Sequence, residues 1–509
     1  MSNTRRPWAI AAAAALAAAT MLSGCGSTGG DAAKTAPDNI ISIAASEPQN
    51  PLVPGNTLET GGGQVNDVLF SGLVGFKADG TAVNEVADKI TPNADNTKFD
   101  ASYLAMIKGY DDLQKDGLKG DEQLSGLKVI DDTHFTIELS KPYSVFPVVL
   151  GFSGYYPLPE SFYKDPKAFG EKPVGNGPYK FKSWKHNDSI QVVKNPDYNG
   201  NFKAANDGLN FKIYTAANAS YADIQSGNLD ISQNVPTSAL KTFTKDPKVN
   251  SYSKASSGIA AFTIPSNLEH FTGEEGVLRR QAISMALDRK QITEKVLSGT
   301  ATPVTDFAAP TISGHSDKLK GSENLEYNPK KAKELWAKAD AISKFTGTFT
   351  LSYNADGDAK SLYDAMANQL KNNLGIDAAT NPVPTFQEFR DEVTKRQLKG
   401  GVKGGWQADY PTIENYLAPI YATSAADGHG ANDGDYKNPK FDALLDEAAK
   451  ASSVDEANKY YQQAEEILLN DLPGIPLYNS NAYAVFGKNV KHAEPNWNGV
   501  PVFHELTKQ

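Results

Sequence analysis

Cysteine is almost absent from this 509-residue sequence, which contains one, Cys25. A chain with a single cysteine cannot form an internal disulfide, so a fold stapled by disulfides is excluded. An excess of positive charge is also absent, because 50 lysines and arginines stand against 60 aspartates and glutamates, a net charge of −10. This acidic balance gives no indication of nucleic acid or of an anionic lipid surface as a partner.

Long hydrophobic runs are confined to the N-terminus. The run from Ala9 to Ala19 follows Arg5 and Arg6 and is shorter than the roughly 20 apolar residues of a membrane span, so it predicts a secretory signal. Leu22-Ser23-Gly24-Cys25 then has the pattern of a bacterial lipobox, whose cysteine carries a lipid. We expect a signal peptide over residues 1–24, lipidation at Cys25, and a flexible tether over residues 25–39. The protein would be extracytoplasmic and held to the cell membrane by the lipid alone.

The residue patterns that mark enzymes and metal sites are missing as well. In Gly151-Phe152-Ser153-Gly154 the second glycine comes one residue too early for a nucleophile elbow, and no glycine-rich phosphate loop occurs. The seven histidines are scattered without H-x-x-x-H spacing. We interpret His429, in Asp427–Gly430, as a loop residue rather than a ligand. The sequence therefore predicts no cofactor, no metal and no enzyme, with a secreted hydrolase as a remote alternative.

What is present is a globular composition with alternating strand-like and helix-like segments. Hydrophobic residues make up 40% of the chain, and its length predicts about two to four domains. Short runs rich in β-branched and aromatic residues predict strands. These runs are Ile40–Ala44, Phe135–Leu139, Tyr179–Trp184, Asn210–Tyr214, Ile259–Ile264 and Thr348–Tyr353.

Predicted helices concentrate in the second half of the chain. Apolar residues near helical spacing predict one helix over Glu274–Leu297 and another that ends at Gly375. Ser453 has the position of an N-cap with Glu456 as its reciprocal partner, which starts a helix that stops at Pro473. The residues expected to be buried along that helix are Ala457, Tyr460, Ala464, Ile467 and Leu468. Mixed strands and helices of this kind predict an α/β chain with more than one lobe.

A series of short segments matches a known family in order and spacing. They are Asn50-Pro51-Leu52, Val68–Val74 with Asp79-Gly80, Val174–Tyr179, Arg280–Ile283, Ala286–Arg289, Tyr327–Pro329, Pro439–Asp442, Ala464–Leu468, Leu472-Pro473 and Ile475–Leu477. Each is weak alone, but together they resemble the bacterial extracellular solute-binding proteins of family 5. That family serves oligopeptide, dipeptide and nickel ABC importers, and this chain looks closest to its oligopeptide-binding members.

The resemblance implies a bilobal α/β architecture of the periplasmic-binding-protein type, the type II clamshell. Lobe one would span residues 40–258, with an accessory region at residues 72–158, and lobe two residues 259–478. Residues 479–509 would return to lobe one, and the crossings would lie near Gly258–Phe262 and Leu477–Ala482. A β-rich stretch usual in the family is missing where Asp100 passes directly to Ala101. This predicts a truncated small accessory domain in lobe one, or a deletion.

The segment from Gly405 to Tyr410 resembles the family's binding motif, Trp-x-x-Asp. In the family's peptide binders this aspartate pairs with the α-ammonium of the peptide, which implies that role for Asp409 and a pocket wall for Trp406. Ala408 and Tyr410 are further expected ligand contacts. An ammonium stripped of water in a closed cleft needs such a carboxylate partner. The residues alone leave open that Asp409 caps a turn and that Trp406 belongs to the core.

Main-chain groups around Leu58-Glu59-Thr60-Gly61 are expected to hold the peptide backbone through strand-like hydrogen bonds. Glu59 and Thr60 therefore join the predicted site. Glycine in this segment lets one backbone approach another closely, although a plain surface loop explains the segment nearly as well.

The resulting hypothesis is a monomeric lipoprotein that captures peptides in a cleft between lobes and delivers them to the permease subunits of an ABC importer. Other ligands stay open. A dipeptide or a nickel complex is one group, although clustered His or Cys for nickel is absent. An oligosaccharide is another, and it would require Trp184, Trp336, Trp406 and Trp497 to share one cleft. A surface adhesin or a signalling receptor without transport is a further alternative.

Overall fold

The computed structural model describes residues 39–55, 57, 60–90, 106–114, 123–356 and 359–509, which form one compact unit. Cys25, Glu59 and the junction of Asp100 with Ala101 lie outside these residues. Lipidation and a truncated accessory domain therefore stay predictions. Along the described part of the chain, no helix is both long enough and apolar enough to cross a membrane.

A mixed sheet of eleven strands organises the described residues. β12 is parallel to β13 and β14, and β1 is parallel to β8 and β9, whereas the other neighbours on the path are antiparallel. β11 (Ala301–Pro303) pairs with β15 beside the path. The path runs through β13 (Asp377–Val383), β12 (Thr348–Asn354), β14 (Gly401–Gln407), β10 (Asn250–Thr263), β15 (Gly474–Phe486), β9 (Ile231–Ser232), β1 (Ile40–Ala45), β8 (Gly208–Ile213), β7 (Ser189–Lys194) and β6 (Tyr179–Lys185).

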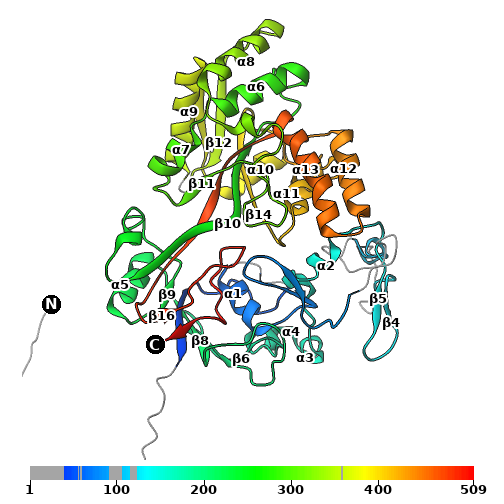
Figure 1. Ribbon diagram of the computed structural model, residues 1–509, viewed down its shortest axis with the longest axis vertical. Helices are drawn as coiled ribbons and strands as arrows, with labels where there is room; N and C mark the ends of the chain where they lie inside the picture. Colours follow the sequence, from blue (N-terminus) through cyan, green and yellow to red (C-terminus); the bar gives the residue numbers. More distant parts are fainter. Residues whose placement is uncertain (1–38, 56, 58–59, 91–105, 115–122, 357–358) are drawn as a thin grey trace, which may run out of the picture. The chain divides into compact units, whose positions relative to one another are not determined.

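Two long strands connect the two halves of this sheet. β10 and β15 pair from Asn250 opposite Phe486 to Thr263 opposite Gly474, with a shift of register between Ala255 and Ile259. Figure 1 shows β10 running from the group that holds β8 and β6 to the group that holds β12 and β14. The strand predicted at residues 259–264 is therefore the end of a much longer element, whose first part the sequence pattern does not reveal.

Smaller elements and helices complete the described chain. Three two-stranded sheets pair β2 (Val74–Phe76) with β3 (Ala82–Asn84), β4 (Leu127–Val129) with β5 (Phe135–Ile137), and β16 (Val490–Lys491) with β17 (Thr507–Lys508). The helices are α1 (Thr60–Leu69), α2 (Phe146–Val149), α3 (Glu160–Lys164), α4 (Pro166–Glu171), α5 (Ala217–Ser226), α6 (Gly273–Met285), α7 (Arg289–Gln291), α8 (Pro329–Ile342), α9 (Lys360–Leu374), α10 (Phe386–Thr394), α11 (Glu414–Tyr421), α12 (Pro439–Lys450) and α13 (Val454–Asp471).

The single helix predicted over Glu274–Leu297 is wrong, because the chain leaves the helix after α6 and starts again in α7. Asp288 is the N-cap of α7, and its carboxylate accepts a hydrogen bond from the N–H of Gln291 at 2.8 Å. The guanidinium of Arg289 is buried and donates to the backbone oxygen of Pro476 in β15 at 2.9 Å. The break allows the N–H groups of the buried Arg289 guanidinium to find acceptors. In a continuous helix the side chain would point in another direction.

The predicted cap of α13 is confirmed, and its partner and buried face differ in detail. The Ser453 hydroxyl accepts from the N–H of Glu456 at 3.1 Å, but the Glu456 carboxylate accepts from the N–H of Ser452 rather than from that of Ser453. Tyr460 and Ile467 are half-buried. The buried face instead follows the helical period through Ala457, Tyr461, Ala464 and Leu468.

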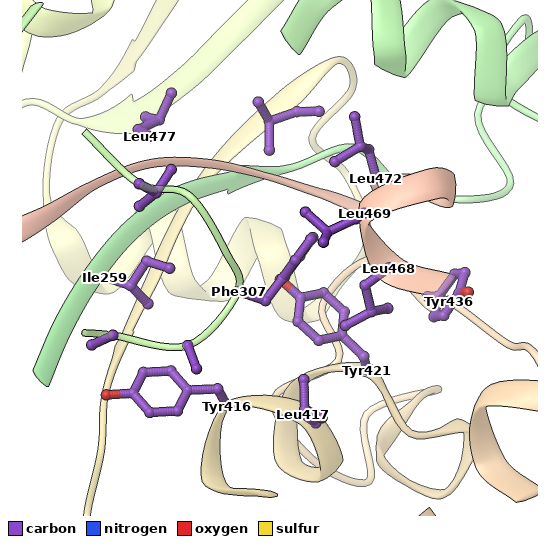
Figure 2. Close-up of a cluster of buried hydrophobic side chains, with 14 of the residues drawn as sticks. Ile259, Phe307, Tyr416, Leu417, Tyr421, Tyr436, Leu468, Leu469, Leu472 and Leu477 are labelled. Atoms are coloured by element: carbon purple, nitrogen blue, oxygen red, sulfur yellow. The ribbon is translucent and has the colours of Figure 1, made fainter. Parts of the chain in front are cut away.

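α11 and α13 meet in the largest hydrophobic core, together with β10 and β15. Figure 2 shows Tyr421 of α11 beside Phe307 and Leu468, with Leu477 and Ile259 farther along the two strands. The rings of Phe307 and Tyr421 lie 5.4 Å apart at nearly a right angle, a favourable arrangement for aromatic pairs. This core fixes the start of α11, and therefore the loop between β14 and α11.

Part of the predicted accessory region packs on the same core. The N–H of Ser144 donates to the backbone oxygen of Ala449 at 2.9 Å, and the hydroxyls of Tyr143 and Tyr410 lie 3.1 Å apart. Residues 143–150, which include α2, thus pack against α12 and against the loop that follows β14.

Candidate functional site

A cavity of about 880 Å³ lies among segments that are far apart in the sequence. Its walls come from α1 and residues 70–85, from residues 151–156, from residues 407–409 at the end of β14, and from residues 496–505 near the C-terminus. This volume is within the range of small-molecule and cofactor sites, about 300–1,000 Å³. A smaller cavity of about 420 Å³ lies among residues 265–433 and contains none of the predicted ligand contacts.

The predicted residues Asp409 and Trp406 are brought together by a third residue, Asn415 of α11. The side-chain oxygen of Asn415 accepts hydrogen bonds from the indole N–H of Trp406 at 2.8 Å and from the backbone N–H of Asp409 at 3.0 Å. Its amide group donates to the Asp409 carboxylate at 3.4 Å. Asp409 is half-buried and lines the cavity, whereas Trp406 is half-buried beside it and does not form the cavity wall.

Ala408 and Tyr410 have different positions. Ala408 is buried and lines the cavity. Tyr410 points into the core, where its hydroxyl donates to the Glu414 carboxylate at 2.9 Å. Burial raises the pKa of Glu414, and it raises the pKa of Tyr410 well above its usual value. Tyr410 therefore anchors the loop that carries Asp409 instead of facing the cavity.

Thr60 lines the cavity as the first residue of α1, while Glu59 lies outside the described residues. Thr60 and Gly61 begin a helix, and Leu58 lies outside the described residues like Glu59, so the strand-like pairing expected of this segment stays a prediction. An open strand edge exists elsewhere. Within the described sheet, β14 pairs with β12 only through Gly401 and Val402, and from Lys403 to Gln407 it pairs with β10 alone. That edge leads directly to Asp409.

The walls of the cavity are rich in aromatic side chains. Phe76 and Trp497 meet edge to face, with ring centroids 5.8 Å apart. Gly151 permits this arrangement, because a Cβ atom there would lie 2.3 Å from the Phe76 ring. At Gly72 a Cβ atom would lie 2.7 Å from the Tyr156 ring, so this ring packs directly on the main chain. Such walls suit a ligand with apolar or cationic groups.

The charges around the cavity are mostly negative. Asp67, Asp79, Glu85, Asp409 and Glu505 line it, and among the described lining residues the Lys and Arg side chains are represented by Lys77 alone. Besides Asp409, two of these acidic groups accept hydrogen bonds from the protein itself. The Glu85 carboxylate accepts hydrogen bonds from Tyr198 and Asn201, and Asp79 accepts one from the N–H of Thr81 at 2.9 Å.

The sequence pattern does not identify two residues that the structure places at the site, Asn415 and Asn498. Asn415 reads as an ordinary polar residue in an amphipathic helix, and only its position six residues after Asp409, across a turn, hints at its role. Asn498 is similar: its side-chain oxygen accepts from Gln407 at 2.7 Å and from Ser257 of β10. The C-terminal segment is thereby tied to the end of β14. Among the described residues, no group of three His, Cys, Asp or Glu is placed to hold a metal ion.

A two-part sheet joined by β10 and β15, with an acidic and aromatic cavity at the end of β14, is the architecture of a bilobal periplasmic binding protein. The chain belongs to the bacterial extracellular solute-binding proteins of family 5, because the model of that family's middle region matches residues 66–428. Members of this family are binding proteins that work with ABC importers. The protein is therefore an extracytoplasmic solute-binding protein.

Curated relatives carry names of several ligands. The chain is 28% identical over 386 residues to heme-binding protein A of Haemophilus influenzae, covering 74% of this chain and 68% of that protein. It is 28% identical over 370 residues to the dipeptide-binding protein DppE of Bacillus subtilis, with coverages of 71% and 66%. The oligopeptide-binding protein OppA of Bacillus subtilis is 26% identical over 423 residues, with coverages of 80% and 74%.

Solved structures agree on the fold. The unliganded open form of the periplasmic murein tripeptide-binding protein MppA superposes with a TM-score of 0.78 at 22% identity, covering 93% of this chain and 98% of that chain. HbpA2 from Haemophilus parasuis gives a TM-score of 0.77 at 20% identity, with coverages of 92% and 99%. At these identities the likeness concerns the fold alone.

Proposed function

We propose that the protein is the lipid-anchored substrate-binding component of an ABC importer and that it captures peptides in the cavity lined by Asp409. The observation that carries this proposal is the pairing of Asp409 with Asn415 at the edge of the cavity. A carboxylate oriented by a buried amide is prepared to receive a cation, because little reorganisation is needed when the ligand arrives. The peptide α-ammonium is that cation.

The open edge of β14 supports the same ligand class. Residues 403–407 have main-chain groups on the side away from β10 that no described strand pairs with. A peptide in extended conformation can pair with such an edge while its N-terminus reaches Asp409, which follows two residues after the strand. This mode binds the backbone and leaves side-chain preference to the cavity walls.

The distribution of tryptophans favours a peptide over an oligosaccharide. Trp497 lines the cavity, but Trp184 donates to Glu47 at 3.2 Å outside it, and Trp336 is buried beneath the guanidinium of Arg279 at 4.5 Å. The stacked aromatic platform that a sugar requires is therefore not assembled from these three side chains. DppE and OppA of Bacillus subtilis are relatives whose names state peptide ligands.

The predicted division into lobes belongs to this proposal. Lobe one over residues 40–258 and 479–509 and lobe two over 259–478 place the crossings in β10 and β15, near their shift of register between Ala255 and Ile259. Closure of the lobes over the ligand would bring Asp409 of lobe two to α1 of lobe one and present the closed form to the permease. Lipidation at Cys25 would hold the protein at the membrane. The protein would act as a monomer.

Native mass spectrometry of the purified full chain tests the ligand class. We expect co-purified peptides with free N-termini, and calorimetry with the same synthetic peptides should give saturable binding to one site. An N-acetylated copy of each peptide is the matched control and should bind more weakly. Recovery of a sugar or a metal complex, with no peptide binding, would overturn the proposal.

A further inference from the structure

One face of α1 lines the cavity. Thr60, Gly63, Gln64, Asp67 and Val68 recur at the helical period and all belong to the cavity wall. The opposite face, which includes Val65 and Leu69, is buried in the core of the adjoining sheet. The core contact of that face fixes the rotation of the helix, and therefore fixes Asp67 toward the cavity.

Asp67 differs from the other cavity carboxylates in having no hydrogen bond or ion pair with any described residue. Asp67 is exposed on the cavity side of α1, and desolvation by the protein around it raises the pKa of its carboxyl to about 7. Solvent that reaches the carboxyl through the cavity weakens the effect of desolvation on the pKa. The direction of the shift still follows from the protein around the carboxyl. A carboxylate that lines a ligand cavity without a protein cation beside it would be stabilised by a cation on the ligand.

The neighbours of Asp67 suit such a cation. Asp67, Glu85 and Tyr156 all line the cavity. After desolvation, the charges of Asp67 and Glu85 raise the pKa of the Tyr156 hydroxyl, which indicates that the three groups lie in one corner of the cavity. The Tyr156 ring packs directly over Gly72. A carboxylate beside an aromatic ring binds an ammonium or guanidinium through charge and through the face of the ring.

We propose that this corner, formed by Asp67, Glu85 and Tyr156, is a subsite for a cationic side chain, so that the ligands are peptides containing lysine or arginine. The inference rests on the proposed peptide-binding function and deepens it. Asp409 takes the α-ammonium, and Asp67 takes a second positive charge on the same ligand. The excess of acidic groups over Lys77 around the cavity acts in the same direction and disfavours ligands with net negative charge.

Calorimetry with a matched set of peptides tests the subsite. Tri- and tetra-alanine serve as the reference, and Lys or Met is placed at each position in turn, since the two side chains are similar in length and differ in charge. At one position Lys should bind roughly tenfold or more tightly than Met to the wild-type full chain. Asp67→Asn should reduce that preference to about twofold or less.

Two further variants make the outcome decisive. Asp79→Asn is the matched control, because Asp79 lines the same cavity but is engaged by Thr81, and it should keep the preference for Lys. Asp67→Lys should reverse the preference, so that Glu binds better than Met at the same position. Equal binding of Lys and Met peptides to the wild type, or a preference that survives Asp67→Asn, would overturn the subsite while peptide binding stands. Failure of every peptide to bind would overturn the proposed function, and the subsite with it.

Discussion

The side-chain oxygen of Asn415 accepts the indole N–H of Trp406 at 2.8 Å, and by this bond α11 holds the end of β14 in place. The same oxygen receives the backbone N–H of Asp409, so one fully buried amide orients both residues of the Trp-x-x-Asp motif. Asn415 therefore links the two residues of the motif.

Replacement of Asn415 by alanine should therefore damage both stability and binding. The indole N–H of the half-buried Trp406 loses its partner, and the loss of such a partner typically lowers the free energy of unfolding by about 1–3 kcal/mol. Peptide affinity should fall as well, because the Asp409 carboxylate is no longer oriented. Chemical denaturation and calorimetry measure the two effects. Asn432→Ala is the control, since Asn432 is also buried and its side chain bonds only to the main-chain groups of Ala422 and Tyr436. It should lower stability without changing the discrimination between free and acetylated peptides, and a loss of discrimination in both variants would contradict the role of Asn415.

Asp409→Ala should weaken binding of free peptides by about 2–5 kcal/mol, because one member of a buried charge pair is removed. This corresponds to a factor of roughly 30 to 4,000 in Kd. An N-acetylated peptide has no ammonium, so it should bind the wild type poorly and lose far less on going to the variant. Calorimetry on the four combinations gives the coupling energy. An equal loss for both peptides would assign Asp409 a structural role.

The preference for a cationic side chain should depend on pH. Asp67 must be ionised to hold a cation, and its pKa of about 7 in the empty cavity means that falling pH protonates it. The charges of Asp67 and Glu85 both act on Tyr156, and Tyr198 and His504 are further titratable groups on which the charge of Glu85 acts. Burial raises the pKa of Tyr156 and Tyr198, so both stay neutral across the relevant range, and burial lowers the pKa of His504. The ratio of Lys to Met affinity should shrink between about pH 8 and pH 5, and it should be flat in Asp67→Asn.

A buried carboxyl pair predicts the pH dependence of stability. Burial, followed by the charge of Asp306, raises the pKa of Glu465 well above its usual value, and burial raises that of Asp306. The folded state therefore keeps a proton that the unfolded state releases, so this contribution is present at acid pH and is lost as pH rises. Glu465→Gln should gain stability relative to the wild type from about pH 5 to pH 8. Thermal unfolding measures it, with Glu466→Gln as the control, and parallel pH profiles would contradict the assignment.

Cys25→Ser should release the protein from the membrane fraction. Diacylation supplies the two chains that stable anchoring normally needs, and a serine at this position cannot carry the thioether-linked lipid. Cell fractionation shows the release, and intact mass shows whether the wild type carries lipid. Retention of the variant in the membrane, with no lipid mass on the wild type, would contradict the lipobox.

The sequence predicts the family and its fold because the matching segments are short, local and ordered along the chain. It also locates Asp409 and Trp406, which a local motif identifies. It does not identify Asn415, whose role depends on how α11 packs against β14, or Asp67, whose role depends on which face of α1 the core buries. The break after α6 was missed for the same reason. The burial of Arg289 against β15 decides it, and that contact joins residues far apart in the sequence.

The pairing of β10 with β15 has a consequence for how the chain is made. β1, near the start, joins β9, which pairs with residues 485–486 of β15, and Lys508 closes the same region through Asn39 and through an ion pair with Asp230 at 2.8 Å. The strands β6, β7, β8, β1 and β9 pair with one another, but this half of the sheet lacks its connection to β15 until residues 485–486 have been synthesised. Contacts of such long sequence separation form slowly. Until β15 has left the ribosome the sheet is therefore incomplete, and an incompletely folded polypeptide is the state that can still be threaded through a narrow channel.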